Sequence, residues 1–159
     1  MLSLEKLIHA QIKAGIHGLV IAGSTGEGSL LSDANYELLL KKSKEFAQNK
    51  IPLVAGLGIG GTEASLKNAL KAKEIGFDGV LASPPAYIKA PQDALAEHFL
   101  EIAAVGLPVC IYEIPGRACS SIALSTIEKM LDSKHPSAKN ILAIKDATGY
   151  LRRCMDEKK

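Results

Sequence analysis

The amino-acid sequence predicts an α/β fold, a partial (β/α)8 TIM barrel with about five of its eight strand–helix units. Short apolar runs alternate with segments of helical hydrophobic period, and one such pair recurs roughly every 30 residues. The unusual polar and aromatic residues fall where several of the apolar runs end, as at the mouth of a barrel. The chain has 159 residues, whereas a complete barrel typically needs about 250. An open, doubly wound sheet is the competing architecture.

The first expected element is a helix, because Leu4, Ile8 and Ile12 recur at helical spacing after Ser3, a suitable N-cap residue. A second helix begins at Ser32 or Asp33. Gly and Pro residues mark the later helix ends and starts. The further helices are expected to span about residues 33–46, 62–75, 91–105 and 124–131.

Each expected strand is a short apolar run bounded by polar residues, glycine or proline. Loops rich in glycine or proline leave the first three strands, and Pro115 begins the loop that leaves the fourth. The strands are expected over residues 19–22, 51–55, 77–82, 107–114 and 141–144.

We assign residues 1–149 to one partial TIM-barrel domain and residues 150–159 to a charged C-terminal tail without a further strand. No strand precedes the first helix, and the pattern stops after five units. We therefore expect a truncated reading frame or a fragment of a longer protein.

Composition favours small-molecule chemistry. The chain is 47% hydrophobic with a formal charge of +2, and its basic residues are interleaved with acidic ones, so neither a nucleic-acid partner nor a membrane partner is expected. The three cysteines lack metal-ligand or redox spacing, and the four histidines are widely separated, so no metal site is expected. No signal peptide is recognisable, and we expect a cytoplasmic protein.

Lys145 ends the last apolar run, residues 141–144, which is typical of a strand buried on both faces of a parallel sheet. Partial desolvation would favour the neutral amine, which can add to a carbonyl and form a Schiff base. The alternative is a strand-end lysine whose charged head reaches solvent.

Other motifs have two interpretations each. The Gly56–Gly61 loop matches a dinucleotide-binding pattern, but Asp78 lies at the wrong end of the next strand for that role. The Gly23–Glu27 turn suits a small carboxylate or is an ordinary turn. Tyr112 points into the barrel mouth or into packing, and Arg117 clamps a carboxylate or is a solvated charge.

Four segments, taken in order, resemble the signatures of the dihydrodipicolinate synthase / N-acetylneuraminate lyase family. They are Gly23-Ser24-Thr25-Gly26-Glu27, Pro84-Pro85-Ala86-Tyr87, Tyr112-Glu113-Ile114-Pro115-Gly116-Arg117 and Ile144-Lys145-Asp146-Ala147-Thr148-Gly149. The resemblance covers nearly the whole chain and implies a class I aldolase that binds pyruvate as an imine, without a cofactor.

The resemblance implies that Lys145 is the Schiff-base lysine and that Tyr112 shuttles protons to the imine and its adducts. Thr25 matches the hydroxyl that links this tyrosine to a second tyrosine, which corresponds to Tyr87. In the family, that second tyrosine reaches into the active site of a neighbouring subunit, so a homo-oligomer, typically a tetramer, is expected.

By the same resemblance, Ser24 and Thr25 hold the pyruvate carboxylate, and Arg117 binds the carboxylate of aspartate semialdehyde, which favours the synthase branch. Two positions depart from the family pattern: Glu113 stands where the family commonly has asparagine, and Ala86 stands where the family often has an aromatic residue. The implied function is condensation of pyruvate with aspartate semialdehyde in lysine biosynthesis. Another pyruvate-dependent aldolase or dehydratase of the family, or a non-catalytic remnant, is the alternative.

Overall fold

The computed structural model describes residues 2–156, in which every strand except the last is followed by a long helix. The helices and strands are α1 (Leu2–Lys13), β1 (Leu19–Ile21), α2 (Asp33–Ala47), β2 (Leu53–Gly56), α3 (Thr62–Ile75), β3 (Gly79–Ala82), α4 (Gln92–Ala104), β4 (Val109–Glu113), α5 (Pro115–Ala118), α6 (Leu124–Leu131), β5 (Ile141–Asp146) and α7 (Leu151–Asp156). Short 3₁₀ turns lie at Ser24–Gly26, Gly28–Leu30 and Ala138–Asn140.

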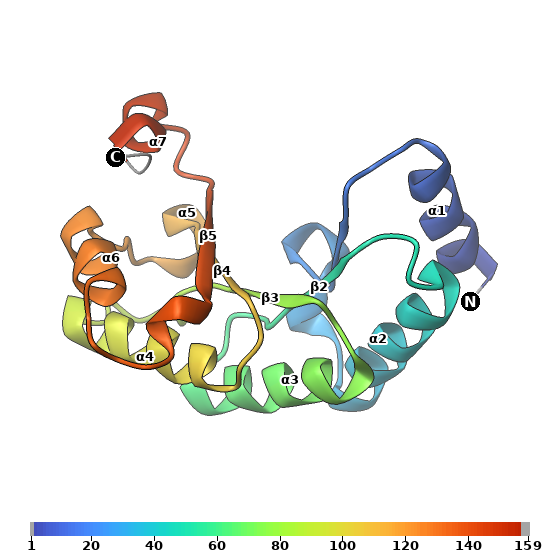
Figure 1. Cartoon of the computed structure of the whole chain (residues 1–159), viewed down its shortest axis with the longest axis horizontal. Coiled ribbons are helices and arrows are strands. Elements are labelled where there is room, and N and C mark those ends of the chain that lie inside the picture. The colour runs from blue at the N-terminus through green and yellow to red at the C-terminus, as the bar shows by residue number, and fades with distance from the viewer. Residues whose placement is uncertain (1, 157–159) are drawn as a thin grey trace.

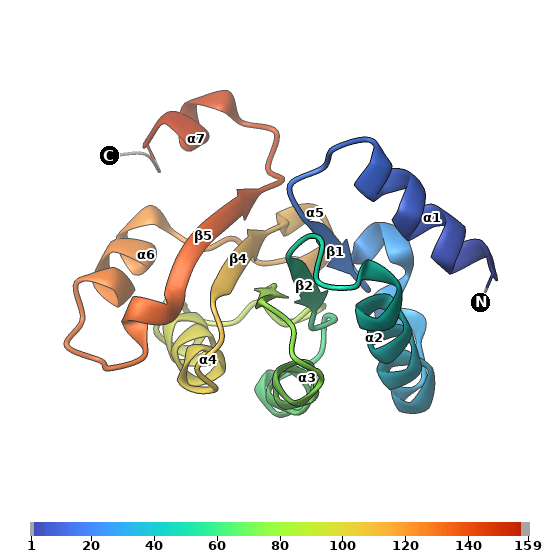
Figure 2. The ribbon, with the colours of Figure 1, turned by 45° about the vertical axis from the view of Figure 1, so that its right-hand side comes forward.

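The five strands form one parallel sheet in the order β1-β2-β3-β4-β5. A doubly wound sheet reverses its strand order at a switch point, and no reversal occurs here. The sheet is curved, and helices α1 to α4 and α6 follow its outer side (Figures 1 and 2). The expected partial barrel is therefore confirmed, and the doubly wound alternative is wrong.

Side chains alternate between the two faces of each strand and form two separate clusters. On β4, Val109 and Ile111 belong to the large core between the sheet and the helices, which also contains Leu40 and Phe99. Tyr112 belongs instead to a smaller cluster with Leu81, Ile114 and Ala118. The smaller cluster lies on the inner face of the curved sheet, because neighbouring residues of a strand point to opposite faces.

Helix ends follow the predicted signals. Ser32 caps α2, and its side chain accepts a hydrogen bond from the backbone N–H of Asn35 at 3.3 Å. Gly76 ends α3 in the left-handed conformation with φ of 87°, where glycine has no steric penalty. The segment after β4, expected as a loop, is the short helix α5, with Pro115 in its first turn.

The expectation that the last strand is buried on both faces is wrong. In the part of the chain that the structure describes, β5 pairs with β4 only, and its Leu142 side chain is 67% exposed. Lys145 is exposed as well. Burial of both faces requires a packed layer on each face, and in the described part of the chain the side of β5 that carries Leu142 is left open, while its outer edge has no strand partner.

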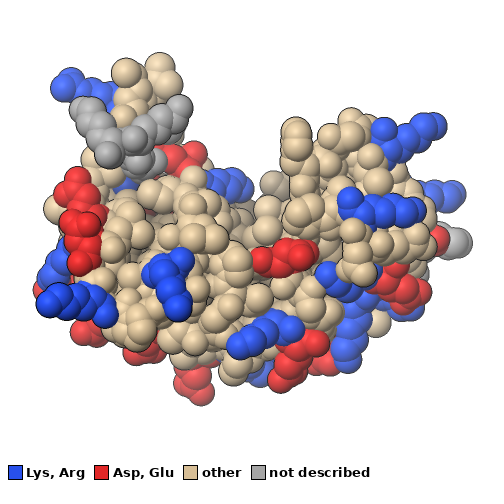
Figure 3. Space-filling view, viewed as in Figure 1, with Lys and Arg blue, Asp and Glu red and all other residues tan. Residues whose placement is uncertain are grey.

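The charged tail expected over residues 150–159 contains helix α7, which the sequence analysis did not predict. Residues 157–159 lie outside the described range. On the face seen in Figure 3, basic and acidic side chains are interspersed. Within residues 2–156, no helix is long and apolar enough to cross a membrane.

His98 of α4 links its helix to α3 and to the loop after β3. Its Nε2–H donates to the carbonyl of Ser83 at 3.1 Å, and its Nδ1 lies 2.9 Å from the hydroxyl of Thr62. Burial lowers the pKa of His98 below its ordinary 6.5, partly offset by the Ser83 hydrogen bond and the charge of Glu101. The fold therefore favours the neutral form of this histidine.

This pKa difference predicts a loss of stability in mild acid. The unfolded chain binds more protons than the folded chain below about pH 6.5, so the His98 contribution is complete above that pH and is lost as the pH falls through the lowered pKa. Urea titrations at pH values between about 5 and 8, which bracket the ordinary pKa range of histidine, should show that the free energy of unfolding decreases as the pH is lowered. This dependence of the free energy of unfolding on pH should become weaker in His98→Gln. It should persist in His17→Gln, which changes an exposed histidine. An unchanged slope in His98→Gln would assign the effect to another group.

Candidate active site

The predicted site residues lie along one edge of the sheet, at or beyond the carboxyl ends of the strands. Ser24 and Thr25 follow β1, Tyr87 follows β3, Tyr112 is in β4 and Lys145 is in β5. Arg117 is in α5, immediately beyond β4. This is the edge at which barrels of parallel strands carry their functional groups.

Lys145 and Tyr112 come from neighbouring strands and lie in contact. They are register partners on β5 and β4, and the Nζ of Lys145 lies 4.0 Å from the centre of the Tyr112 ring. An ammonium over an aromatic face is attracted to the ring electrons. Tyr112 is only 8% exposed and belongs to the inner-face cluster, so the lysine side chain turns onto the inner face of the sheet.

A small cavity of about 30 Å³ brings further residues together. Ser24, Tyr112 and Arg117 all line it, along with Gly23 and Gly58. A hydroxyl, a phenol and a guanidinium from three different segments therefore share one space, large enough for about one or two waters. The glycine-rich loop after β2 forms part of its wall.

Thr25, Tyr87 and Lys145 do not line this cavity, and Lys145 reaches it only through its contact with the Tyr112 ring. Thr25 is exposed on the 3₁₀ turn Ser24–Gly26, next to Ser24, which does line it. Among the described residues, no hydrogen bond connects Thr25, Tyr112 and Tyr87. The expected chain of three hydroxyls is not assembled in this structure.

Tyr87 stands out in the loop between β3 and α4. Its side chain is 92% exposed, and its φ of 74° is unusual for a bulky residue. Hydrogen bonds hold the backbone on both sides of it, from Ala86 N–H to the Ile59 carbonyl at 3.0 Å and from the Ser120 hydroxyl to the Ile88 carbonyl at 2.7 Å. A strained conformation persists only where neighbouring contacts determine it.

Cys110 lies on the same face of β4 as Tyr112, opposite Ala143 of β5. Burial raises the pKa of its thiol, and the nearby charge of Lys145 offsets part of this increase. The thiol therefore stays protonated at neutral pH and is a poor nucleophile. Lys145 remains the nucleophilic candidate at this position.

The sequence of the whole chain matches the model of one protein family. The model of the dihydrodipicolinate synthetase family matches residues 1–159. The chain belongs to this family. The predicted resemblance is thereby confirmed, and the family fold agrees with the partial barrel described above.

Relatives of the dihydrodipicolinate synthetase family align with only part of their length. The 4-hydroxy-tetrahydrodipicolinate synthase of Stenotrophomonas maltophilia (strain K279a) is 37% identical over 146 residues, which are 91% of this chain and 48% of that protein. The solved structure of the 4-hydroxy-tetrahydrodipicolinate synthase of Methylacidiphilum fumariolicum SolV has a TM-score of 0.92 and 35% identity, over 98% of this chain and 51% of that one. The chain thus spans about half the length of the relatives it matches.

A second similar structure contains a bound ligand. It is the chloride-inhibited dihydrodipicolinate synthase of Acinetobacter baumannii complexed with pyruvate, with a TM-score of 0.87 and 33% identity. The match covers 98% of this chain and 54% of that one.

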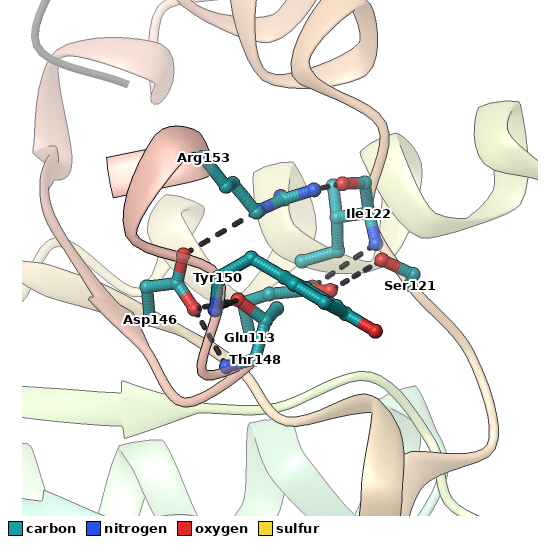
Figure 4. Close-up of polar contacts among 7 residues, drawn as sticks. All are labelled: Glu113, Ser121, Ile122, Asp146, Thr148, Tyr150 and Arg153. Carbon is teal, nitrogen blue, oxygen red and sulfur yellow. Dashed lines mark hydrogen bonds and ion pairs between the residues drawn. The ribbon is translucent and has the colours of Figure 1, made fainter. Parts of the chain in front are cut away.

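Three charged residues near the family site were not assigned a role from the sequence. Glu113 is fully buried beside Tyr112, and Asp146 and Arg153 form an ion pair with Nε and Oδ2 3.6 Å apart (Figure 4). The Asp146 carboxylate accepts hydrogen bonds from the N–H and hydroxyl of Thr148, both at 2.6 Å. The Asp-x-Thr spacing is typical of such a turn and could have indicated this contact.

A metal centre has no evident ligands here. Among residues 2–156 with described side chains, no group of three or more His, Cys, Asp and Glu residues could hold a metal ion.

Proposed function

We propose that this chain carries the imine-forming part of a class I aldolase of the 4-hydroxy-tetrahydrodipicolinate synthase type, which condenses pyruvate with aspartate semialdehyde in lysine biosynthesis. The observation that carries this proposal is the pairing of Lys145 with Tyr112, with Nζ 4.0 Å from the ring centre at the functional edge of the sheet. A nucleophilic amine and a proton-carrying phenol are the two groups that imine chemistry requires.

The proposed reaction begins with the neutral amine of Lys145, which adds to the C2 carbonyl carbon of pyruvate and forms a C–N bond. The resulting carbinolamine accepts a proton on its hydroxyl and loses water as the C–O bond breaks, which leaves an iminium. Loss of a proton from the methyl carbon gives an enamine, whose carbon attacks the aldehyde carbon of the second substrate as the aldehyde oxygen takes up a proton. A nucleophile, either water or the amine of the substrate, then adds to the regenerated iminium carbon, and cleavage of the C–N bond releases Lys145. Pyruvate in the similar Acinetobacter baumannii structure supports the choice of first substrate.

Tyr112 is proposed to carry the protons of these steps, because its ring lies directly under the Lys145 amine. Ser24 shares the cavity with Tyr112, whereas its neighbour Thr25 does not. We therefore assign the hydroxyl next to the phenol to Ser24, and Thr25 and Tyr87 remain predicted members of the relay.

Replacing Tyr112 by Phe should slow imine formation while it preserves the packing of the ring. General acid–base catalysis typically contributes about 100-fold or more, so we expect a decrease of roughly that size in the rate constant for pyruvate addition. Stopped-time trapping with borohydride, followed by mass spectrometry, measures this rate. Thr25→Val should reduce the rate less than Ser24→Ala does. An unchanged rate in Tyr112→Phe would assign the phenol to packing alone.

Arg117 is proposed to bind the carboxylate of the second substrate, because it lines the cavity with Tyr112 and its guanidinium offers a planar fork. Arg117→Lys keeps the charge but loses the fork. We expect about a tenfold weaker apparent affinity for aspartate semialdehyde, with pyruvate imine formation nearly unchanged. If imine formation falls equally, Arg117 supports the fold and not the second substrate.

A homo-oligomer is proposed on the basis of Tyr87. A phenol that is 92% exposed on a restrained, strained loop is placed to contact a second copy of the chain. Sedimentation of the wild type and Tyr87→Ala tests this contact.

The decisive test of the proposed function is chemical trapping. Incubation with pyruvate and borohydride should attach one reduced pyruvate unit per chain, located on Lys145 by peptide mass spectrometry. Adducts distributed over surface lysines would reject the proposal.

A further inference from the structure

Three consecutive residues, Ser120 to Ile122, contact the sequence neighbours of the predicted catalytic residues. The Ser120 hydroxyl donates to the Ile88 carbonyl at 2.7 Å, directly after Tyr87. The Ser121 hydroxyl and the Ile122 N–H donate to the two carboxylate oxygens of Glu113, at 2.5 and 3.0 Å. Glu113 directly follows Tyr112. We call residues 120–122 the junction segment.

The third connection runs to the lysine strand through Arg153 of α7 (Figure 4). Its Nη2 donates to the Ile122 carbonyl at 2.7 Å, and its Nε forms the ion pair with Asp146 at 3.6 Å. Asp146 directly follows Lys145. Ile122 is therefore bound on two sides. Its N–H donates to Glu113 of β4, and its carbonyl accepts from Arg153 of α7, which is itself paired with Asp146 of β5.

Apart from the hydrogen bond of Ser121, whose residue is exposed, these contacts are largely removed from water. Glu113 and Ile122 are fully buried, and Ser120 is 8% exposed. The side chains of Arg153 and Asp146 are 16% and 6% exposed. Leaving a buried polar or charged group without its partner costs more than the hydrogen bond itself contributes, so this arrangement has few alternatives.

The junction segment also closes the loop that carries Arg117. This loop leaves β4 at Glu113 and returns to the side chain of the same residue at Ile122. Arg117 lies between the two anchor points, and its N–H donates to the Ile114 carbonyl at 3.0 Å. The position of the guanidinium thus depends on how the far end of the loop is held.

We propose that the junction segment fixes Arg117 relative to Lys145, and that Arg153 is the positioning residue that joins the segment to the lysine strand. This role rests on the proposed function of Lys145 and Arg117. Lysine cannot replace Arg153, because only the guanidinium fork presents separate N–H groups to a carboxylate and a carbonyl at once.

The test compares Arg153→Lys with Arg152→Lys, which makes the same change at the adjacent, exposed arginine. Hydrogen exchange by mass spectrometry reports on residues 119–123. Titration with succinate, an unreactive carboxylate, reports on Arg117, and borohydride trapping with pyruvate reports on Lys145. All three measurements use the chain of residues 1–159.

We expect Arg153→Lys to speed exchange at residues 119–123 about tenfold and to weaken succinate binding several-fold, while the yield of the pyruvate adduct changes less than twofold. Arg152→Lys should change none of these. In an Arg117→Ala background, Arg153→Lys should have no further effect on succinate binding, because coupled residues are not additive.

Unchanged exchange in Arg153→Lys would overturn the inference, and so would equal losses of succinate binding and pyruvate adduct. An additive effect in the Arg117→Ala background would also overturn it. A wild-type chain that forms no pyruvate adduct would reject the proposed function instead, and the exchange comparison would still decide whether Arg153 anchors the segment.

Discussion

Replacing Lys145 by Ala should abolish the covalent pyruvate adduct. A Schiff base requires a primary amine at the reacting position, and neither the phenol of Tyr112 nor the half-buried thiol of Cys110 can supply one. Trapping with borohydride should give one adduct per wild-type chain and less than about one per cent of that yield in Lys145→Ala, in line with the loss of a nucleophile.

Lys139→Ala is the matched control, because it removes an exposed lysine just before the same strand. Its adduct yield should equal that of the wild type, and circular dichroism should show that both variants keep their helix content. A persistent adduct in Lys145→Ala would move the reactive amine elsewhere and would leave the Lys145–Tyr112 pair as a packing contact.

The order and type of the long elements could be predicted from local sequence. Apolar runs, helix caps and glycine C-caps act within a few residues, so Ser32 and Gly76 mark helix ends in the structure as they do in the sequence. The strand boundaries in the structure differ by one or two residues from those expected from the sequence, because hydrogen bonding to the neighbouring strand determines where pairing starts.

The burial of β5 could not be predicted from its own residues. Leu142 and Ile144 have the composition of a central strand, but exposure depends on what lies beside them. The sequence also gives no clear sign of α7, whose Arg153 matters through contacts with residues 122 and 146. Contacts between distant segments are set by the fold and not by local pattern.

The candidate site shows the same limit at finer scale. Family motifs place Ser24 and Thr25 together on one turn, and adjacent residues on a 3₁₀ turn point in different directions. The structure places Ser24 in the cavity with Tyr112 and leaves Thr25 outside it. The motif predicted the turn correctly, whereas which of its two side chains lines the cavity depends on the three-dimensional fold.

Replacing Gly28 by Ala should strongly destabilise the protein and disturb this turn. A Cβ at Gly28 would lie 1.9 Å from the carbonyl oxygen of Ala22 and 2.6 Å from its carbonyl carbon. These are backbone atoms, and Ala22 has a φ of 57°, so it has little freedom to move away. We expect a loss of about 3 kcal/mol in the free energy of unfolding, a large part of a typical 5–15 kcal/mol. Urea titration followed by circular dichroism measures it.

Gly26→Ala is the control in the same turn, because a Cβ there would meet nothing within 4 Å. Its free energy of unfolding should stay within about 0.5 kcal/mol of the wild type, as is usual for surface changes. The Ala22 carbonyl also lies 2.4 Å from a Cβ built at Gly56, so it is enclosed by the 3₁₀ turn Gly28–Leu30 on one side and by β2 on the other. Relief of the Gly28 clash must therefore move the turn that carries Ser24, and pyruvate trapping should slow in Gly28→Ala even in the fraction that remains folded. Equal stability of the two variants would show that Ala22 can shift freely and that the close approach does not hold the turn in place.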